Sequence, residues 1–294
     1  MHLNFGFTAV QTLWTLTFAA LLVLLVVLQG RDRSRRFPWF TASIALVALR
    51  LLTSRLLFGR LPGITLNGIF ITLADVAALV GLLVVAEMAR RAFHGVARRI
   101  WVSVTLAAVA VGAVVLYFWG PWPALSSLTA DSYLAILRLM QLAAQKSDLL
   151  LNVLAIELGL LVVVFGRRFK AGWRSHTQQI VIGLSTAAIA QLGVQGIWQA
   201  IAMKAAPQTQ AEYEHILGLR DKLFNGNSVV YVAVLVWWIV CLWRDEPGTK
   251  AEAEALNAAP EPVYLESPVI ATDENSTETA PAAENAENTD ETSK

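Results

Sequence analysis

The chain has 294 residues, of which 56% are hydrophobic and only 15% charged, and its mean hydropathy is +0.54. A soluble domain carries about 25% charged residues, so this composition excludes a soluble globular protein and predicts a polytopic membrane protein. The net charge of +1 hides two unlike parts, because residues 1–244 hold 21 Lys and Arg against 9 Asp and Glu, whereas residues 245–294 hold 2 against 13.

Seven apolar segments are long enough to cross a bilayer. In chain order they are residues 8–29, 39–58, 68–88, 101–119, 148–166, 177–203 and 227–243. We interpret the first as a span rather than a signal peptide, because it lacks a basic n-region and a small-residue cleavage site, and its apolar run is too long. The expected fold is an all-α bundle of seven transmembrane helices over residues 1–244.

Lys and Arg alternate between rich and poor connections along the chain. The rich connections are residues 30–39, 89–100 and 166–176, which lie on one side of the membrane in a seven-span topology. The positive-inside rule assigns that side to the cytoplasm. The sequence therefore predicts a bacterial inner-membrane (cytoplasmic-membrane) protein, surrounded by a lipid bilayer, with its N-terminus outside and its C-terminus in the cytoplasm.

Two of the connections predicted outside are long, at residues 120–147 and 204–226. The stretch at 130–148 has helical periodicity, so it either lies on the membrane or extends the fifth span outward. The second connection is polar, with one short amphipathic piece at 213–224. Such loops either engage ligands and partners or shield the ends of the spans.

Polar residues recur at one estimated depth within four of the predicted spans. At about 1.5 Å per residue, Arg50, Asp75 and Glu157 lie about equally far from the outer ends of their spans, as does Gln195. Glutamines recur every four residues in the sixth span, and an asparagine lies a turn and a half from Glu157. The candidate ligand or ion-path residues are Arg50, Asp75, Asn152, Glu157, Gln191, Gln195 and Gln199.

Two interpretations of this polar layer stay open. In one it is a buried clamp, in which Arg50 pairs with Asp75 or Glu157 and the amides satisfy the remaining donors and acceptors. In the other it is a polar cavity, open to the outside, that binds a small ligand or passes a proton.

No catalytic motif is present: the sequence lacks HExxH, GxSxG, a P-loop, GxGxxG and CxxC. The four histidines lie in tails, connections or span ends, and the seventh span has no lysine for a retinal Schiff base. His94 and His176 are interpreted as solvated residues among arginines rather than as metal ligands. We therefore expect a non-enzymatic protein with no metal, no cofactor and no nucleic-acid partner.

The acidic segment at 245–294 has few large apolar residues and is expected to be a disordered cytoplasmic tail. One denser patch at 260–270 either docks a signalling partner or is part of a solubilising tail. Its candidate docking residues are Val263, Tyr264, Leu265, Val269 and Ile270.

The predicted topology resembles that of bacterial seven-transmembrane sensory modules, with a basic, Trp-containing connection (166–176) leading into a glycine-bearing sixth span. The resemblance covers residues 1–244 and implies a sensor or receptor that recognises a ligand or partner at its outer face. Since no output domain follows residue 243, it also implies a separate cytoplasmic partner. The alternative is a small transporter or proton-coupled permease that uses Asp75 and Glu157.

Overall fold

The computed structural model describes residues 9–57, 59–94, 97–119, 122, 133–165, 175–204 and 209–245. The chain divides into two compact units, Met1–Ala251 and Glu252–Lys294, and every described residue belongs to the first unit. The predicted tail lies outside the described residues except for Asp245, and so do its five docking candidates.

The described residues form eight helices and no strand. The helices are α1 (Ala9–Gly30), α2 (Arg33–Arg36), α3 (Pro38–Leu57), α4 (Gly63–Ala92), α5 (Arg98–Phe118), α7 (Tyr133–Phe165), α8 (His176–Lys204) and α9 (Gln210–Trp243). All except the four-residue α2 are long and apolar enough to cross a membrane. The prediction of an all-α membrane protein with seven spanning helices is confirmed.

Two helices are longer than the apolar runs alone predict. α7 begins at Tyr133 rather than near residue 148, so the periodic stretch at 130–148 extends the fifth span. α9 begins at Gln210, because the Thr209 side chain accepts a hydrogen bond from the Glu212 backbone N–H at 3.3 Å. A Thr followed three residues later by a Glu is the capping-box pattern, which starts a helix well before the apolar run.

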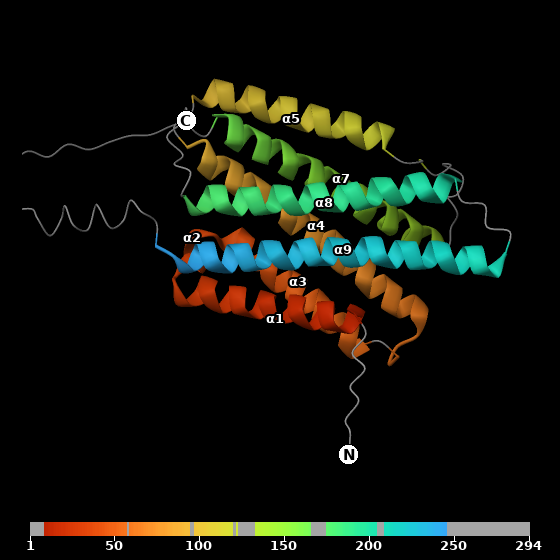
Figure 1. Cartoon of the computed structure of the whole chain (residues 1–294). Coiled ribbons are helices and arrows are strands. Elements are labelled where there is room, and N and C mark those ends of the chain that lie inside the picture. Colours follow the sequence, from red (N-terminus) through yellow and green to blue (C-terminus); the bar gives the residue numbers. More distant parts are fainter. Residues whose placement is uncertain are drawn as a thin grey trace, which may run out of the picture. The chain divides into compact units, whose positions relative to one another are not determined.

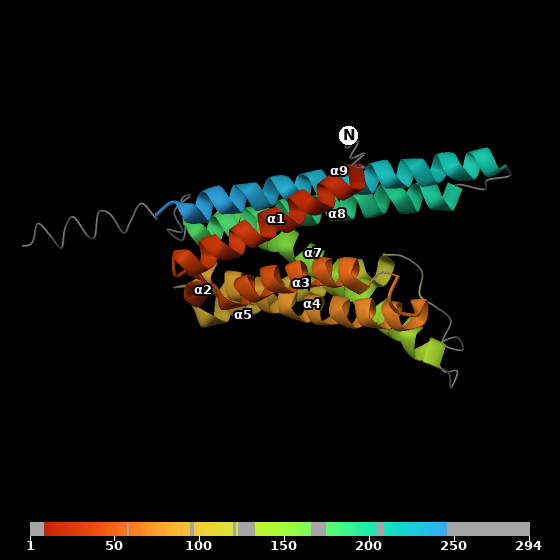
Figure 2. The same ribbon diagram turned by 90° about the horizontal axis from the view of Figure 1, so that it is seen from below.

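Within the first unit, six helices form a closed ring in the order α1, α3, α4, α7, α8, α9 and back to α1. Figure 2 shows α8 and α9 together on one side of the ring and α3, α4 and α5 on the other. α5 packs mainly on α7, outside the ring, and α4 and α8 also touch across it. Figure 1 shows that these helices run along a common direction, as expected of spans in one bilayer.

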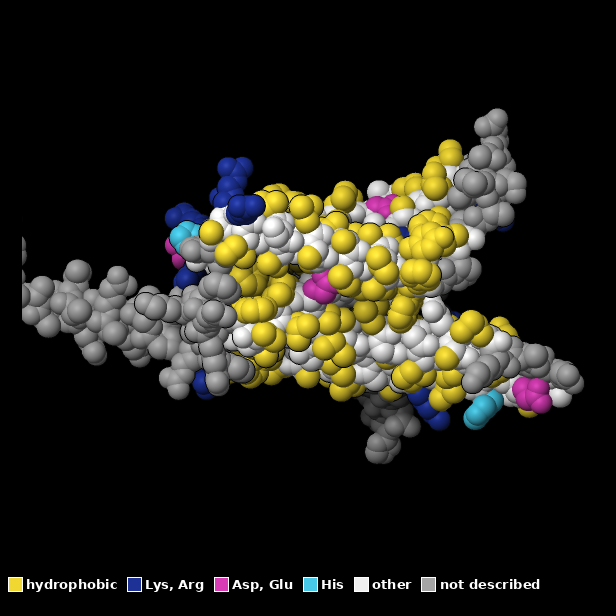
Figure 3. Space-filling model, turned by 90° about the horizontal axis from the view of Figure 1, so that it is seen from above, with side chains coloured by type: hydrophobic (Ala, Val, Ile, Leu, Met, Phe, Trp, Pro, Cys, Tyr) yellow, Lys and Arg dark blue, Asp and Glu magenta, His cyan; other side chains and the backbone are white. Residues whose placement is uncertain are grey.

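The outer surface of this bundle is mainly apolar. α5 is the extreme case, with exposed side chains that include Leu106, Val109, Val114 and Phe118. Figure 3 shows one face on which hydrophobic side chains cover the middle, while many of the Lys and Arg side chains gather at one end. A surface of this kind fits a hydrocarbon environment and not water.

We call the end of the bundle that carries Arg31, Arg33, Arg91, Arg98 and Arg244 the basic end, and the opposite end the distal end. The main hydrophobic core lies in the half next to the basic end. Its members include Leu21, Leu24, Leu28, Phe40, Met88, Val162, Ile180, Val181, Leu235, Trp238 and Leu242. Trp238 on α9 meets Phe40 on α3 edge to face with ring centroids 5.1 Å apart, so side chains link two helices that are not neighbours in the ring.

α8 approaches both of its ring neighbours closely through small residues. A Cβ atom at Gly183 would overlap the indole of Trp238 on α9, and a Cβ atom at Gly159 on α7 would overlap Ser185. The Ser185 hydroxyl lies 2.7 Å from the Ala155 carbonyl on α7 and 2.8 Å from the Val181 carbonyl on its own helix. Its single proton bonds one of them at a time, so the contact between α7 and α8 combines close packing with a polar tie.

Gly183 therefore supports a testable prediction. In Gly183→Ala the new methyl group has no room, and overpacking should lower the free energy of unfolding by about 1–3 kcal/mol. The matched control is Gly193→Ala on the same helix, where the glycine faces open space. The control should be neutral or slightly stabilising, because alanine favours a helix over glycine by about 1 kcal/mol. Thermal unfolding in detergent measures both, and equal Tm values would contradict the packing.

Candidate functional site

A set of polar side chains from four helices comes together in the distal half of the bundle, and we call it the distal polar cluster. Its members are Arg50 on α3, Asp148 and Asn152 on α7, Gln191 and Gln195 on α8, and Asn227 on α9. Four of the seven sequence candidates, Arg50, Asn152, Gln191 and Gln195, belong to it.

Asp148 lies at the centre of the cluster. The side chains of Gln195 and Asn152 donate hydrogen bonds to its carboxylate, and the Arg50 guanidinium lies near enough to act on it electrostatically. The Asn152 amide also bonds the Asp148 backbone carbonyl at 2.9 Å, one turn away on α7. The carboxylate is thus held by groups from three helices that belong to different parts of the sequence.

A second contact links the cluster to α9. The Asn227 amide nitrogen donates to the side-chain oxygen of Gln191, and both residues are partly buried. Since Gln191 and Gln195 lie one turn apart on one face of α8, that face contacts both the Asp148 carboxylate and α9. Gln199, the third glutamine of this series, is exposed.

The distal polar cluster is not sealed inside the protein. Asp148, Asn152, Gln191 and Gln195 are half-buried, and Arg50 is exposed. The Arg50 guanidinium is exposed and the Asp148 carboxylate is only half-buried, so the surrounding side chains do not enclose this contact. The polar groups of the cluster are therefore not closed off by the protein itself.

The other two charged candidates lie elsewhere. Glu157 is on α7, and both of its carboxylate oxygens are buried without a hydrogen-bond partner among the described residues. Asp75 is half-buried on α4. Neither belongs to the groups that contact the Asp148 carboxylate.

The candidate residues predicted from the sequence do not include Asp148 or Asn227, although the sequence contains a signal for each. Asp148 is the first residue of the predicted fifth span, and its spacing of four from Asn152 puts the two residues on one helix face. Asn227 is likewise the first residue of the predicted seventh span. Because α7 and α9 extend further than expected, both residues lie inside a helix rather than at its end.

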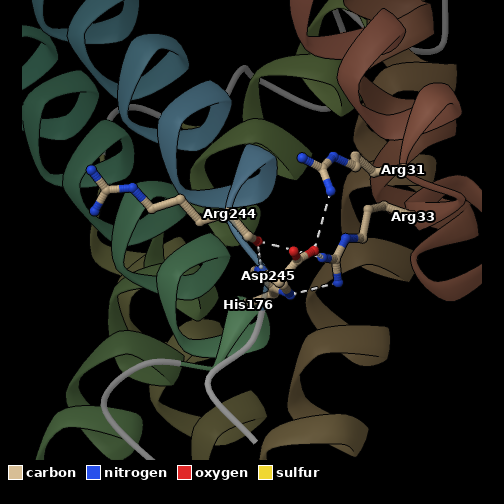
Figure 4. A network of polar contacts seen from close by, with 5 residues as sticks. All are labelled: Arg31, Arg33, His176, Arg244 and Asp245. Carbon is tan, nitrogen blue, oxygen red and sulfur yellow. Dashed lines mark hydrogen bonds and ion pairs between the residues drawn. The ribbon is translucent and has the colours of Figure 1, made fainter. Parts of the chain in front are cut away.

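A second polar assembly lies at the basic end, where α1, α2, α8 and α9 meet, and we call it the basic-end network (Figure 4). Arg33 Nη1 lies 2.9 Å from His176 Nδ1, and His176 Nε2 lies 3.0 Å from the Arg244 carbonyl oxygen. Arg31 Nη1 lies 3.3 Å from Asp245 Oδ1, and Arg33 Nη2 lies 3.7 Å from the same oxygen.

His176 corrects one sequence interpretation. It was expected to be a solvated histidine, but it is only 1% exposed and contacts two distant parts of the chain. Arg33 is also largely buried, with a side chain 12% exposed, so its charge is compensated by the network and not by water. These contacts join residues more than 65 positions apart, so no local pattern could reveal them.

A buried carboxylate on α4, that of Glu87, links α4 to α3 at the basic end of the bundle. Glu87, with a side chain 7% exposed, pairs with Arg91 at 3.1 Å. Its other oxygen accepts from the Phe40 backbone N–H at 3.3 Å. Phe40 is the third residue of α3, where backbone N–H groups have no partner within the helix and an anion is favoured.

Within the described ranges, no three His, Cys, Asp or Glu side chains come together as a metal site would require. Comparison of the chain with protein-family models, with curated proteins and with solved structures found no match. The functional argument therefore depends on the two polar assemblies and on the helices that join them.

Proposed function

We propose that this protein is a non-enzymatic, receptor-type membrane protein that binds a small polar solute at the distal polar cluster and reports to a cytoplasmic partner. One observation carries the proposal: the same two helices contribute to both polar assemblies. α8 supplies Gln195 to the distal polar cluster and His176 to the basic-end network. α9 supplies Asn227 to the distal polar cluster, and Arg244, the residue directly after its last residue, supplies its carbonyl oxygen to the basic-end network.

The distribution of charge supports the orientation that this function needs. Lys and Arg concentrate in the connections at the basic end, and such connections face the cytoplasm. The N-terminus and the distal polar cluster then face the outside, and the acidic tail from Asp245 onward lies in the cytoplasm. The candidate docking patch at 260–270 is available there to a separate output protein, as the resemblance to seven-span sensory modules suggests.

The chemistry of the distal polar cluster indicates a class of solute. Arg50 complements a carboxylate, Asp148 complements an ammonium group, and Gln195 and Asn152 offer amide donors and acceptors. A small zwitterion of the amino-acid type supplies both charges and replaces the contact between Arg50 and Asp148. A solute with one charge would leave one of the two residues without compensation.

The test uses the purified full chain in detergent or nanodiscs and the twenty common amino acids as probes. At least one amino acid should raise the Tm, because a solute that binds only the folded state stabilises it by about 2.7 kcal/mol at 100 times its Kd. Arg50→Gln and Asp148→Asn should each abolish the shift. Arg55→Gln, an exposed arginine on the same helix, should retain it.

The receptor proposal also requires that solute binding at the distal polar cluster change the dynamics of the basic end. The amino acid that raises the Tm should change amide hydrogen exchange in residues 239–243, the last turn of α9. A Tm shift that persists in Asp148→Asn would contradict solute binding at the distal polar cluster. Binding that leaves exchange in the last turn of α9 unchanged would contradict the receptor and favour a binding or transport protein.

A second candidate function, a proton-coupled permease, is favoured by Glu157. A carboxylate without a partner inside a membrane bundle is costly, and such groups commonly mark proton or ion paths. In proteoliposomes this function predicts pH-dependent flux, followed with an internal pH dye, that falls strongly in Glu157→Gln and Asp75→Asn. Asp221→Asn, at an exposed position on α9, is the control. Normal flux in both of the first two variants would exclude this function.

A further inference from the structure

The hydrogen bonds of His176 fix its protonation state. A guanidinium only donates, so Nδ1, which lies 2.9 Å from Arg33 Nη1, accepts a hydrogen bond. A carbonyl oxygen only accepts, so Nε2, which lies 3.0 Å from the Arg244 oxygen, donates one. The basic-end network therefore requires the neutral imidazole with its proton on Nε2.

A second proton on His176 is incompatible with this arrangement. The imidazolium carries a proton on both nitrogens, so Nδ1–H would point at the Arg33 guanidinium, another donor. Two cations would then be in contact at a site where the imidazole is 1% exposed and water screens little. Protonation thus replaces an attractive contact between α8 and α2 with a repulsive one.

His176 contacts the residue that directly follows α9, because its Nε2 atom bonds the carbonyl oxygen of Arg244. Arg33 Nη2 lies 3.4 Å from the Arg244 carbonyl oxygen, which also accepts from His176. The same guanidinium and Arg31 contact Asp245, the residue after Arg244 (Figure 4). Displacing Arg33 therefore weakens the attachment of the last turn of α9 and of the first residue of the acidic segment.

Other described charged groups lie near His176 on the neighbouring elements of the basic end. On or directly next to α1, α2 and α9 they are Arg31, Asp32, Arg33, Arg35, Arg36, Arg244 and Asp245. Arg31, Arg33, Arg244 and Asp245 belong to the network, and Arg35 lies 3.6 Å from Asp32. On α4, which also contacts α8, they are Glu87, Arg90 and Arg91, of which Glu87 and Arg91 pair with each other. The part of α7 that follows Glu157, residues 158–165, carries no charged residue. Histidine is the side chain that ordinarily changes charge between about pH 5 and 8.

We infer that His176 is a proton-operated latch between α2, α8 and the end of α9. The latch is closed at neutral pH, and acidification on the side of the membrane that the basic end faces opens it and frees the start of the acidic segment. It depends only on contacts at the basic end, so it stands whether or not the distal polar cluster binds a solute.

Hydrogen exchange on the full chain tests the latch. Between about pH 7.5 and about pH 5, after correction for the intrinsic pH dependence of exchange, the amides of residues 239–243 should exchange about tenfold faster, as expected when a hydrogen-bonded contact between helices is lost. His176→Gln keeps a donor and an acceptor but does not titrate, so it should remove this step. His94→Gln, which replaces an exposed histidine at the same end, should retain it. A step that persists in His176→Gln, or no step in the wild type, would overturn the latch.

A second measurement does not require the His176 variant to fold. In the triple variant His2→Gln, His94→Gln, His215→Gln, the only remaining imidazole is that of His176. Nitrogen-15 spectra of its ring should show the Nε2–H tautomer at neutral pH and the cation at low pH, with the same midpoint as the exchange step. The opposite tautomer, or a ring that stays neutral throughout, would overturn the inference.

Discussion

The structure depends on the close approach of α8 to its two neighbours. At Gly159 the α7 backbone lies directly against the Ser185 side chain of α8, and at Gly183 the α8 backbone lies directly against the Trp238 indole of α9. Helices in a membrane gain little from hydrophobic exclusion, since lipid is as apolar as the protein, so close packing must supply the association energy. These contacts build a dry, apolar core in the half of the bundle next to the basic end.

The division of the bundle follows from that core. Where α7, α8 and α9 pack tightly the side chains are mainly apolar, with Ser185 as a hydrogen-bonded exception, and the polar cluster of Arg50, Asp148 and their amide neighbours lies in the other half. A tightly packed core transmits a displacement rather than absorbing it. α8 and α9 are continuous through this core, and we propose that a change at the distal polar cluster reaches the basic-end network along them.

The sequence predicted the parts that depend on local pattern. The spanning helices follow from long apolar runs free of internal proline. Counting residues placed Arg50, Asp75, Glu157 and Gln195 at one depth, and of these Arg50 and Gln195 belong to the distal polar cluster. It did not predict how far α9 extends, because the capping contact between Thr209 and Glu212 lies outside the apolar run. It did not predict a role for Asp148, because the predicted fifth span begins at that residue. It missed the burial of His176 because Arg33 and Arg244 come from opposite ends of the bundle sequence.

The most direct test measures water access along α8. In a Cys241→Ala background, which removes the single native thiol, a cysteine is placed in turn at positions 195, 191, 184 and 181 and treated with a membrane-impermeant thiol reagent. The proposed structure and orientation predict labelling from outside the cell at 195 and 191, and none at 184 or 181, where the core is packed. Labelling at 181 as fast as at 195, or protection at all four positions in a folded protein, would contradict the division into a polar half and a dry half.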